Sequence, residues 1–449
     1  MKVISAAVGM YDIMERKVTL VESLEKKRAP FPDMAAIYIL APTADSIERL
    51  LEDYSSKSKV LYGNDVFLYF LGRIPETYLD RIKKCKQLIK RLKALSEINV
   101  HFLAKEERAF LLDMRSSFRE FYLRNTPTPK ELSIAEQLVT VCATLNEYPY
   151  VRYNKESGIC SSLASLFNLK MEEFVASNPT WWFHGSGKSQ NKHLERDRSS
   201  LLLLDRASDC LTPLMHDFTY QAMVNDLLDV KGDQITYKAE SADDPDVKED
   251  KDVLLNEKDK LWCELRGKHI AQVIEILSAR IQEVVNSSTG NALSKNKSDG
   301  NMSLSQMASA LKELPEYREI MSKLSQHMHL AHECMDVFNR TGLLDLSDVE
   351  QTLATGKDEE GRSPKLIEMI SRAEGAMIRM IDSKARLRMM LIATVSQGGL
   401  SGSDRDRLLR TANLGQAEIQ TLNNLEQMGV STLASPSSGG GGGNRFFGG

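Results

Sequence analysis

The sequence predicts a chain of the α/β plus α class, with parallel sheets in its first part and mostly helices in its second. Its 449 residues are too many for one ordinary hydrophobic core, so two or three domains are expected. Near the N-terminus, short apolar runs alternate with helical patterns, an order typical of a parallel sheet with right-handed crossovers. From Leu261 onward, helical periodicity dominates.

Four short runs rich in β-branched or aromatic residues predict strands buried on both faces: residues 18–21, 36–40, 66–71 and 98–103. A helix is expected over residues 44–54, with Thr43 as its cap. A second helix is expected over residues 76–95, because six apolar side chains there fall on one helical face: Leu79, Ile82, Leu88, Ile89, Leu92 and Leu95.

The middle of the chain continues the alternation less regularly. Residues 126–177 have helical patterns that break at Pro149 and Gly158. Four leucines followed by Asp205 predict a buried strand over residues 201–205, and a helix is expected over residues 217–228. The acidic stretch 241–260 predicts a surface loop.

The C-terminal part is expected to be mostly helical. Residues 286–301 are rich in Ser, Asn, Lys and Gly and predict a flexible segment. A long helical pattern over residues 304–338 is interrupted at Pro315. Further helices are expected over residues 365–395 and 403–428, and the Gly/Ser-rich tail 435–449 cannot pack a core.

Composition narrows the possible functions. Hydrophobic residues make up 42% and charged residues 27%, which predicts a soluble globular protein. The net charge of −4 gives no global attraction to nucleic acid or anionic membrane. The cysteines are too scattered for a disulfide framework and predict reduced thiols in the cytoplasm: Cys85, Cys142, Cys160, Cys210, Cys263 and Cys334.

Two motifs resemble catalytic or ligand sites but lack the context that such sites need. Residues 185–189, GSGKS, end like a phosphate-binding loop, yet Trp182 stands at the first glycine position. A phosphohydrolase could use Asp205 as its nucleophile, but Ala207 stands where the second acid would be. The alternative is that Asp205 and Asp209 pair with Arg206 or cap the next turn.

A cluster of histidines and a run of basic residues each allow two interpretations. His327, His329, His332 and Cys334 lie close in the sequence, but on a helix only His329 and His332 share a face, so ordinary helix histidines are favoured over a metal site. A run of cations predicts a solvated helix face, with an acidic partner or lipid headgroups as the alternative: Arg81, Lys83, Lys84, Lys86, Lys90, Arg91 and Lys93. We therefore expect no catalytic, metal or cofactor site.

Five collinear segments carry a resemblance to a known family. They are residues 10–30, residues 201–223 (LLLLDRASDCLTPLMHDFTYQAM), residues 253–271 (beginning VLLNEKDKLWCELR), residues 304–334 and residues 349–356. Together they resemble the SM (Sec/Munc) family, and most of all its plasma-membrane branch of syntaxin-binding exocytosis proteins. The resemblance covers about residues 2–431.

The resemblance implies an arch of three domains around a cavity. Domain 1 is a parallel α/β unit over residues 1–125, and domain 2 is represented by its first segment, residues 126–228. Domain 3, residues 229–434, is largely helical, and a tail follows at 435–449. The family's first strand and the second segment of its domain 2 have no counterpart here. The chain is therefore expected to be shortened at both ends, with apolar sheet faces and edges exposed.

The resemblance also implies the function. The chain is expected to bind a syntaxin-type SNARE, to template assembly with a vesicle SNARE, and to be recruited peripherally to membranes by SNAREs, with no enzymatic activity, cofactor or nucleic-acid partner. A phosphohydrolase centred on Asp205 and a fragment without function are the alternatives. The expected partner-binding residues lie on domain 1 and on the 304–338 helix: Glu22, Lys26, Lys27, Arg28, Pro315, Met321, Leu324 and Met328.

Overall fold

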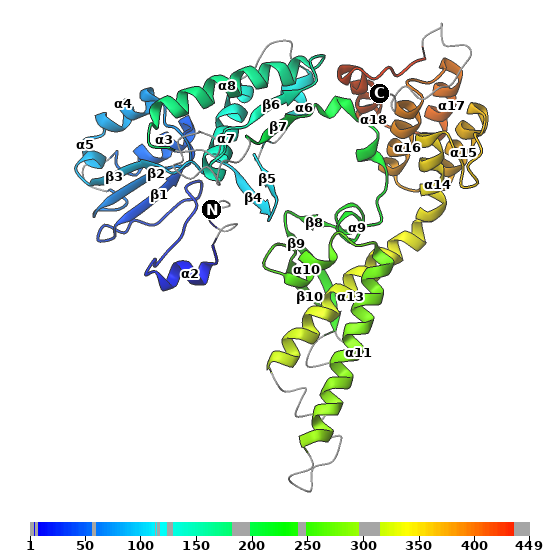
Figure 1. Ribbon diagram of the computed structural model, residues 1–449, viewed down its shortest axis with the longest axis horizontal. Helices are drawn as coiled ribbons and strands as arrows, with labels where there is room; N and C mark the ends of the chain where they lie inside the picture. Colours follow the sequence, from blue (N-terminus) through cyan, green and yellow to red (C-terminus); the bar gives the residue numbers. More distant parts are fainter. Residues whose placement is uncertain are drawn as a thin grey trace. The chain divides into compact units, whose positions relative to one another are not determined.

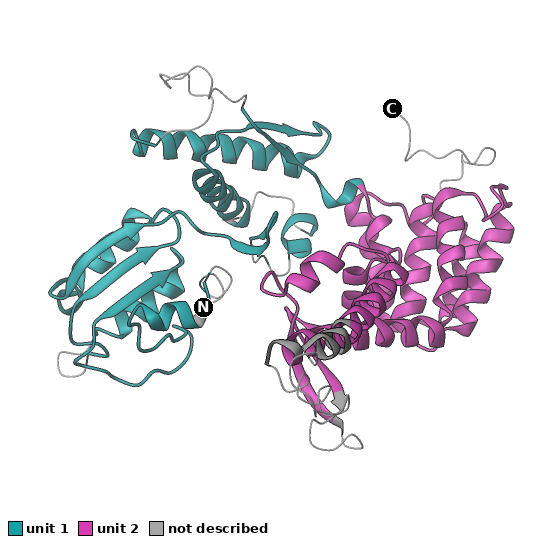
Figure 2. Cartoon of the chain, turned by 60° about the horizontal axis from the view of Figure 1, so that its bottom comes forward, with its two compact units in different colours: residues 1–208 teal, residues 209–449 magenta. Residues whose placement is uncertain are grey.

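The computed structural model describes residues 8–55, 60–112, 117–123, 129–181, 198–240, 248–295 and 315–434, together with Ile4 and Met114. The chain forms two compact units, residues 1–208 and 209–449 (Figure 2). The predicted fold class is confirmed: the first unit contains parallel sheets with helices, and the second is mostly helical (Figure 1). The division into three domains stays a prediction.

The first sheet of unit 1 is parallel, as expected. It has the order β1 (Ala36–Leu40), β2 (Val66–Phe70) and β3 (Leu92–Glu97). On β1, buried side chains alternate with exposed ones, and Ile37 and Ile39 are 63% and 40% exposed. The buried face packs against α3 (Ala44–Glu52), α4 (Glu76–Lys84) and α5 (Lys86–Ile89). The Thr43 side chain caps α3 by accepting a hydrogen bond from the backbone N–H of Ser46.

Three predictions for this region are wrong in part. Residues 18–21 lie in no strand, and the chain enters them through Lys17, whose φ is +64°. The expected helix 76–95 breaks at Cys85, where ψ is 88°, and its end is strand β3. The strand expected at 98–103 is not formed: residues 98–102 follow the end of β3 and lie in no strand, and Leu103 begins β4 (Leu103–Glu106), which forms a hairpin with β5 (Ala109–Leu111).

The rest of unit 1 is a second layer of helices on a two-stranded parallel sheet. It comprises α6 (Ser117–Tyr122), α7 (Pro129–Leu145), β6 (Tyr150–Tyr153), α8 (Gly158–Ser177) and β7 (Ser200–Leu203). Strand β6 lies where only helix was expected. Strand β7 was predicted, but Leu202 is 58% exposed, so its expected burial on both faces is wrong. Only one face packs on α7 and α8. The N-terminal helix α2 spans Met10–Glu15.

Unit 2 begins with a short helix and a hairpin that support two long helices. Its first elements are α9 (Tyr220–Leu227), β8 (Val230–Lys231), β9 (Gln234–Glu240), β10 (Lys248–Leu254) and α10 (Lys260–Leu265). Helices α11 (Ile270–Lys295) and α13 (Pro315–Thr341) then lie side by side (Figure 1). The prediction of a loop at 241–260 is partly wrong, because β10 and the start of α10 lie there. The prediction of a flexible segment at 286–301 is also wrong in part, because residues 286–295 belong to α11.

The end of unit 2 is a helical bundle around one core. Its helices are α14 (Leu343–Thr355), α15 (Leu366–Arg379), α16 (Ser383–Ser396), α17 (Gly402–Ala412) and α18 (Gln416–Asn423), followed by a 3₁₀ turn at Asn424–Met428. Residues 185–189 and the tail 435–449 lie outside the described residues. None of the helices described here is both long and apolar enough to cross a bilayer.

Candidate partner-binding surfaces

The charged segment from Glu22 to Arg28 forms a turn on unit 1 that is fixed at both ends. Glu22 accepts a hydrogen bond of 3.2 Å from the Tyr62 hydroxyl, and Arg49 donates one to the backbone carbonyl of Glu25. Directly after the Glu25 contact, the side chains of Lys26 and Lys27 are exposed. Within the described residues, neither ammonium group lies in an ion pair, so both are available to a partner.

Arg28 differs from its neighbours because it is built into the fold. Its guanidinium donates two hydrogen bonds of 2.8 and 3.0 Å to the Asp53 carboxylate. This carboxylate also accepts a hydrogen bond of 2.7 Å from the Tyr38 hydroxyl. The side chains of Arg28 and Asp53 are only 9% and 8% exposed. Burial alone would lower the pKa of Arg28, but the hydrogen bonds and charge of Asp53 raise it. Arg28 therefore anchors the turn rather than presenting its charge to solvent.

The residues expected to bind a partner on the long helix lie on α13, where Met321, Leu324 and Met328 form an apolar stripe. Leu324 is 4% exposed and belongs to the core that α13 shares with α9, α10 and α11. Met321 and Met328, at spacings that place them beside Leu324, are half-buried and pack against the same core. Pro315 is the first residue of α13, the helical position that tolerates a proline because its missing N–H needs no partner.

A buried polar network joins α13 to the start of unit 2, and sequence reasoning missed it. His327 is fully buried, its Nδ1 lies 3.0 Å from the Tyr220 hydroxyl, and its Nε2 lies 3.2 Å from Asp259. Asp259 also accepts a hydrogen bond of 2.9 Å from the Lys323 ammonium group, and it caps α10 by accepting hydrogen bonds from the N–H groups of Leu261 and Trp262. Burial alone would raise the pKa of Asp259, but these hydrogen bonds lower it well below its ordinary value.

The histidine cluster is accordingly dispersed. His327 is buried, whereas His329 is exposed and its Nε2 lies 4.0 Å from Glu333, so the two histidines have different environments. Among the described residues, no three His, Cys, Asp or Glu side chains converge as metal ligands. A buried histidine on a helix face is a signal of a satisfied core group, as the bonds to Tyr220 and Asp259 show.

Asp205 is held by three donors. The Ser157 hydroxyl donates a hydrogen bond of 2.7 Å to one carboxylate oxygen. The Tyr122 hydroxyl and the backbone N–H of Ala207 donate hydrogen bonds to the other oxygen. Burial would raise the pKa of Asp205, but these hydrogen bonds lower it. Asp209 caps the next turn through the N–H groups of Leu211 and Thr212. These three hydrogen bonds match a structural role, in which Asp205 fixes the turn that follows β7.

The basic run of residues 81–93 is spread over α4, α5 and β3 and does not form one helix face. Arg81 and Lys83 pair with Glu48 and Asp80 at 3.6 and 3.2 Å. Arg91 donates to the backbone carbonyl of Gly63. These contacts match solvated, locally compensated charges.

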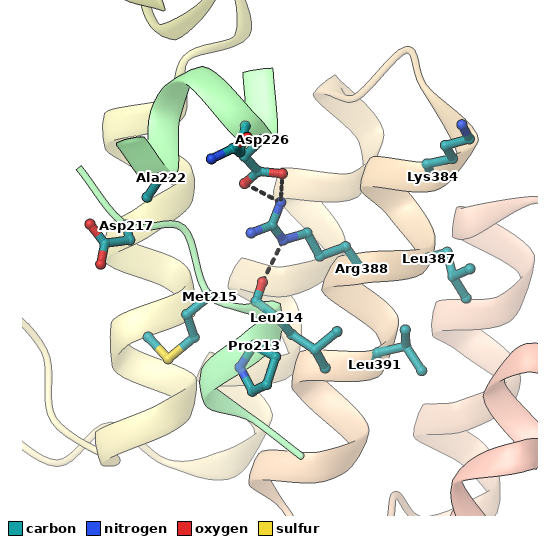
Figure 3. A pocket seen from close by; sticks show the side chains of 11 residues that line it. Pro213, Leu214, Met215, Asp217, Ala222, Asp226, Lys384, Leu387, Arg388 and Leu391 are labelled. Atoms are coloured by element: carbon teal, nitrogen blue, oxygen red, sulfur yellow. Dashed lines mark hydrogen bonds and ion pairs between the residues drawn. The ribbon is translucent and has the colours of Figure 1, made fainter. Parts of the chain in front are cut away.

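Unit 2 contains a pocket of about 470 Å³ between the segment 213–226 and helix α16 (Figure 3). Its apolar surface is formed by Pro213, Leu214, Met215, Ala222, Leu387 and Leu391. Arg388 holds its two sides together by donating to the Leu214 carbonyl and, at 3.0 and 2.7 Å, to both oxygens of Asp226. Behind it, His216 bonds to Glu350 of α14 at 2.8 Å, where Glu350 is 2% exposed.

Sequence comparison gives one consistent result. A model of the Sec1 family matches residues 1–443. The chain is 34% identical over 436 residues to "Protein transport protein sec1" of Dictyostelium discoideum, a match covering 96% of this chain and 69% of that protein. It is 29% identical over 447 residues to the SNARE-interacting protein KEULE of Arabidopsis thaliana, covering 98% and 65%. The chain thus spans about two thirds of the length of these relatives.

Solved structures agree with the sequences. The chain is similar to the Unc18–syntaxin 1 complex from Monosiga brevicollis, with a TM-score of 0.80 and 25% identity, over 96% of this chain and 74% of that chain. The SM protein Vps45, in its complex with the Qa SNARE Tlg2, shares the fold at a TM-score of 0.69 and 20% identity, over 94% of this chain and 69% of that one. The resemblance found in the sequence is confirmed, and the chain belongs to the Sec1 family.

Proposed function

We propose that this chain binds a syntaxin-type SNARE and regulates SNARE assembly in exocytosis, acting by binding with no bond made or broken. The observation that carries the proposal is the likeness, over 96% of the chain, to an Unc18 protein whose structure was solved in complex with syntaxin 1. A relative described as SNARE-interacting supports the same class of partner.

Two surfaces are proposed to take part. On unit 1, the exposed ammonium groups of Lys26 and Lys27, with Glu22 beside them, contact the syntaxin. Arg28 contributes by holding this turn through Asp53. Charges at the rim of an interface set its association rate and register more than its affinity.

On unit 2, helix α13 offers a template for SNARE helices, including a vesicle SNARE. Met321 and Met328 are half-buried and can repack against a partner, because methionine side chains are flexible. Leu324 supports them from the core, and Pro315 sets where the helix begins. The stripe has the spacing that a helical partner reads.

The protein is proposed to work in the cytoplasm and to reach the plasma membrane or vesicles peripherally, through its SNARE partners. A net charge of −4 provides no global attraction to anionic lipid or nucleic acid, which favours recruitment by protein partners.

The proposal is tested by titrating the purified chain with the cytoplasmic region of a plasma-membrane syntaxin in a calorimeter. We expect saturable one-to-one binding, and no turnover of phosphate esters by the same preparation. Absence of binding by a folded, monomeric chain would refute the proposal. A phosphatase activity that is lost in Asp205→Asn would favour the hydrolase alternative instead.

A further inference from the structure

The pocket between the segment 213–226 and α16 contains two charges that the fold does not compensate. The charge of Asp226 is matched by Arg388, which binds both carboxylate oxygens. Lys384 is exposed and lies on α16, and among the described residues no carboxylate lies within ion-pair distance of its ammonium group. Asp217 is exposed, and its recorded bond is the 2.6 Å hydrogen bond that it accepts from the Thr219 N–H. Figure 3 shows Asp217 and Lys384 at opposite sides of the pocket.

The position of Lys384 is unfavourable for its own helix. Helix α16 begins at Ser383 after the cap Asp382, so Lys384 is the second residue of its first turn. The N-terminus of a helix carries the positive end of the helix dipole and favours acidic side chains. Helix stability therefore does not explain a cation here, whereas recognition of an acidic group at the pocket does.

The pocket wall restricts the form of a ligand. Its described lining consists of helices α9 and α16 and the 3₁₀ turn at Thr212–Leu214, so it has no strand edge to which an extended peptide could add. A proline-rich peptide would need aromatic side chains in the pocket wall, and none of the described lining residues is aromatic. The one arginine is already neutralised by Asp226, which argues against a phosphate group. The lining combines apolar side chains with charged ones, and a groove of this kind between helices is the geometry that accepts an amphipathic helix.

We propose that this pocket is a docking site for an amphipathic helix of a protein partner. The helix inserts apolar side chains between Leu214, Leu387 and Leu391, with an acidic residue against Lys384 and a basic residue against Asp217. The site is preformed, because Arg388 joins its two sides and His216 ties the segment 213–226 to Glu350. It is separate from the turn at Glu22–Arg28 and from the stripe on α13, so it adds a third interaction surface.

The test uses the full chain and three designed helical peptides of about 20 residues, long enough to be helical in water. All three carry the same leucine stripe. The mixed peptide has glutamates along one flank of the stripe and lysines along the other, the acidic peptide has glutamates on both flanks, and the basic peptide has lysines on both. Wild-type protein is expected to bind the mixed peptide about fivefold more tightly than either of the others, from one favourable pair replaced by a repulsive one.

Lys384→Glu makes both sides of the pocket acidic and is expected to invert this preference, so that the basic peptide binds best. Because the substitution improves the charge at the start of α16, its melting temperature should equal or exceed that of the wild type. Asp217→Lys makes both sides basic and should favour the acidic peptide.

The matched control is Arg379→Glu, which changes the net charge equally but lies on α15 outside the pocket lining. If this control gains as much affinity for the basic peptide as Lys384→Glu does, the effect is non-specific and the docking site is refuted. Equal affinity of wild-type protein for all three peptides, or binding to none, refutes it as well. Syntaxin binding by Lys384→Glu should be unchanged, which separates this test from that of the proposed function.

Discussion

Charged residues that are neighbours in the sequence have opposite roles in this protein. Lys26 and Lys27 extend into solvent, whereas the guanidinium of Arg28 is buried against Asp53. Three consecutive basic residues predict one basic surface. Burial instead gives Arg28 a structural role and leaves Lys26 and Lys27 for recognition. Removing one partner of a buried pair leaves an uncompensated charge, so Arg28 is unsuited to probing binding alone.

Reversing the two exposed lysines together, Lys26→Glu with Lys27→Glu, is expected to weaken syntaxin binding about tenfold at low salt and less at high salt. Exposed charges act through screened electrostatics, which fade as ionic strength rises. Calorimetric titrations at two salt concentrations measure the effect. The matched control is Lys86→Glu with Lys90→Glu, two exposed cations at the two ends of α5, which changes the net charge equally and should leave binding unchanged. Unaltered affinity in the double variant would remove this turn from the interface.

Asp259→Asn isolates the charge of the buried network, because asparagine also caps helices well and preserves the start of α10. A carboxyl whose pKa is lower in the folded than in the unfolded state stabilises the fold above its unfolded pKa of about 3.9. That contribution is lost as pH falls through both values. We therefore expect a loss of about 1–3 kcal/mol in unfolding free energy at neutral pH, shrinking below about pH 4.

Urea unfolding at several pH values tests this dependence on Asp259. Asp336→Asn, an exposed carboxylate on α13, should show no such change with pH. A deficit for Asp259→Asn that stays constant from neutral pH to below pH 4 would mean that bond geometry, and not charge, is what the variant loses.

At the scale of elements, the sequence predicted the strands and helices that local chemistry determines. It missed those that depend on pairing with distant segments of the chain. Strands β1 and β2 and helix α3 could be predicted because apolar runs and the Thr43 cap are local signals. Strand β3 was missed because Leu92 and Leu95 continue the helical phase of α4 and the lysines around them favour helix. Pairing of β3 with β2, which overrides that preference, is not visible in the sequence.

Strand β10 was missed for a related reason. Its charges predict a loop, but β10 pairs with β9 in a register that sets Asp250 opposite Lys238, and the Thr236 hydroxyl donates a hydrogen bond to Asp252. The buried side chains of Ile235 and Val253, which lie opposite each other, anchor the hairpin in the core. The pocket on α16 was also missed, since it brings together segments more than 150 residues apart, as the 162-residue separation of Arg388 and Asp226 shows. Only Lys384 at a helix N-terminus could have indicated it.

Helix α13 can be probed at both ends of its proposed template. Pro315→Ala restores a backbone donor and removes the ring that blocks a preceding turn, so the helix can extend and a vesicle SNARE should bind more tightly. Met328→Arg should weaken that binding about tenfold yet leave the fold intact, because a half-buried arginine can run its stem along the surface and place its charge in water. Pull-down and thermal melting measure both effects.

Leu324→Arg is the control for α13, since it places a charge in the core and should unfold unit 2. If Met328→Arg destabilises the protein as much as Leu324→Arg, and Pro315→Ala alters only the melting temperature, the stripe is core and SNARE helices bind elsewhere.

At the scale of the whole molecule, two units with separate cores share one family match. The described core residues form two clusters in unit 1 and two in unit 2. The family model extends through both units, so the match depends on neither alone. Ile37 and Ile39 remain exposed on β1, at the edge of a type of sheet that is usually covered on both faces.

Calorimetry of the whole chain can show whether a syntaxin engages both units, as the proposed surfaces on Lys26–Lys27 and α13 require. Units with separate cores are expected to unfold in two transitions. A ligand stabilises the unit that contains its binding site, by about 2.7 kcal/mol at a free ligand concentration one hundred times its Kd.

Saturating syntaxin should therefore raise both transition temperatures. In the Lys26→Glu, Lys27→Glu variant the rise should be reduced in unit 1, and in Met328→Arg it should be reduced in unit 2. A rise confined to one transition in the wild-type protein would mean that the partner rests on one unit, and that the other proposed surface serves a different ligand.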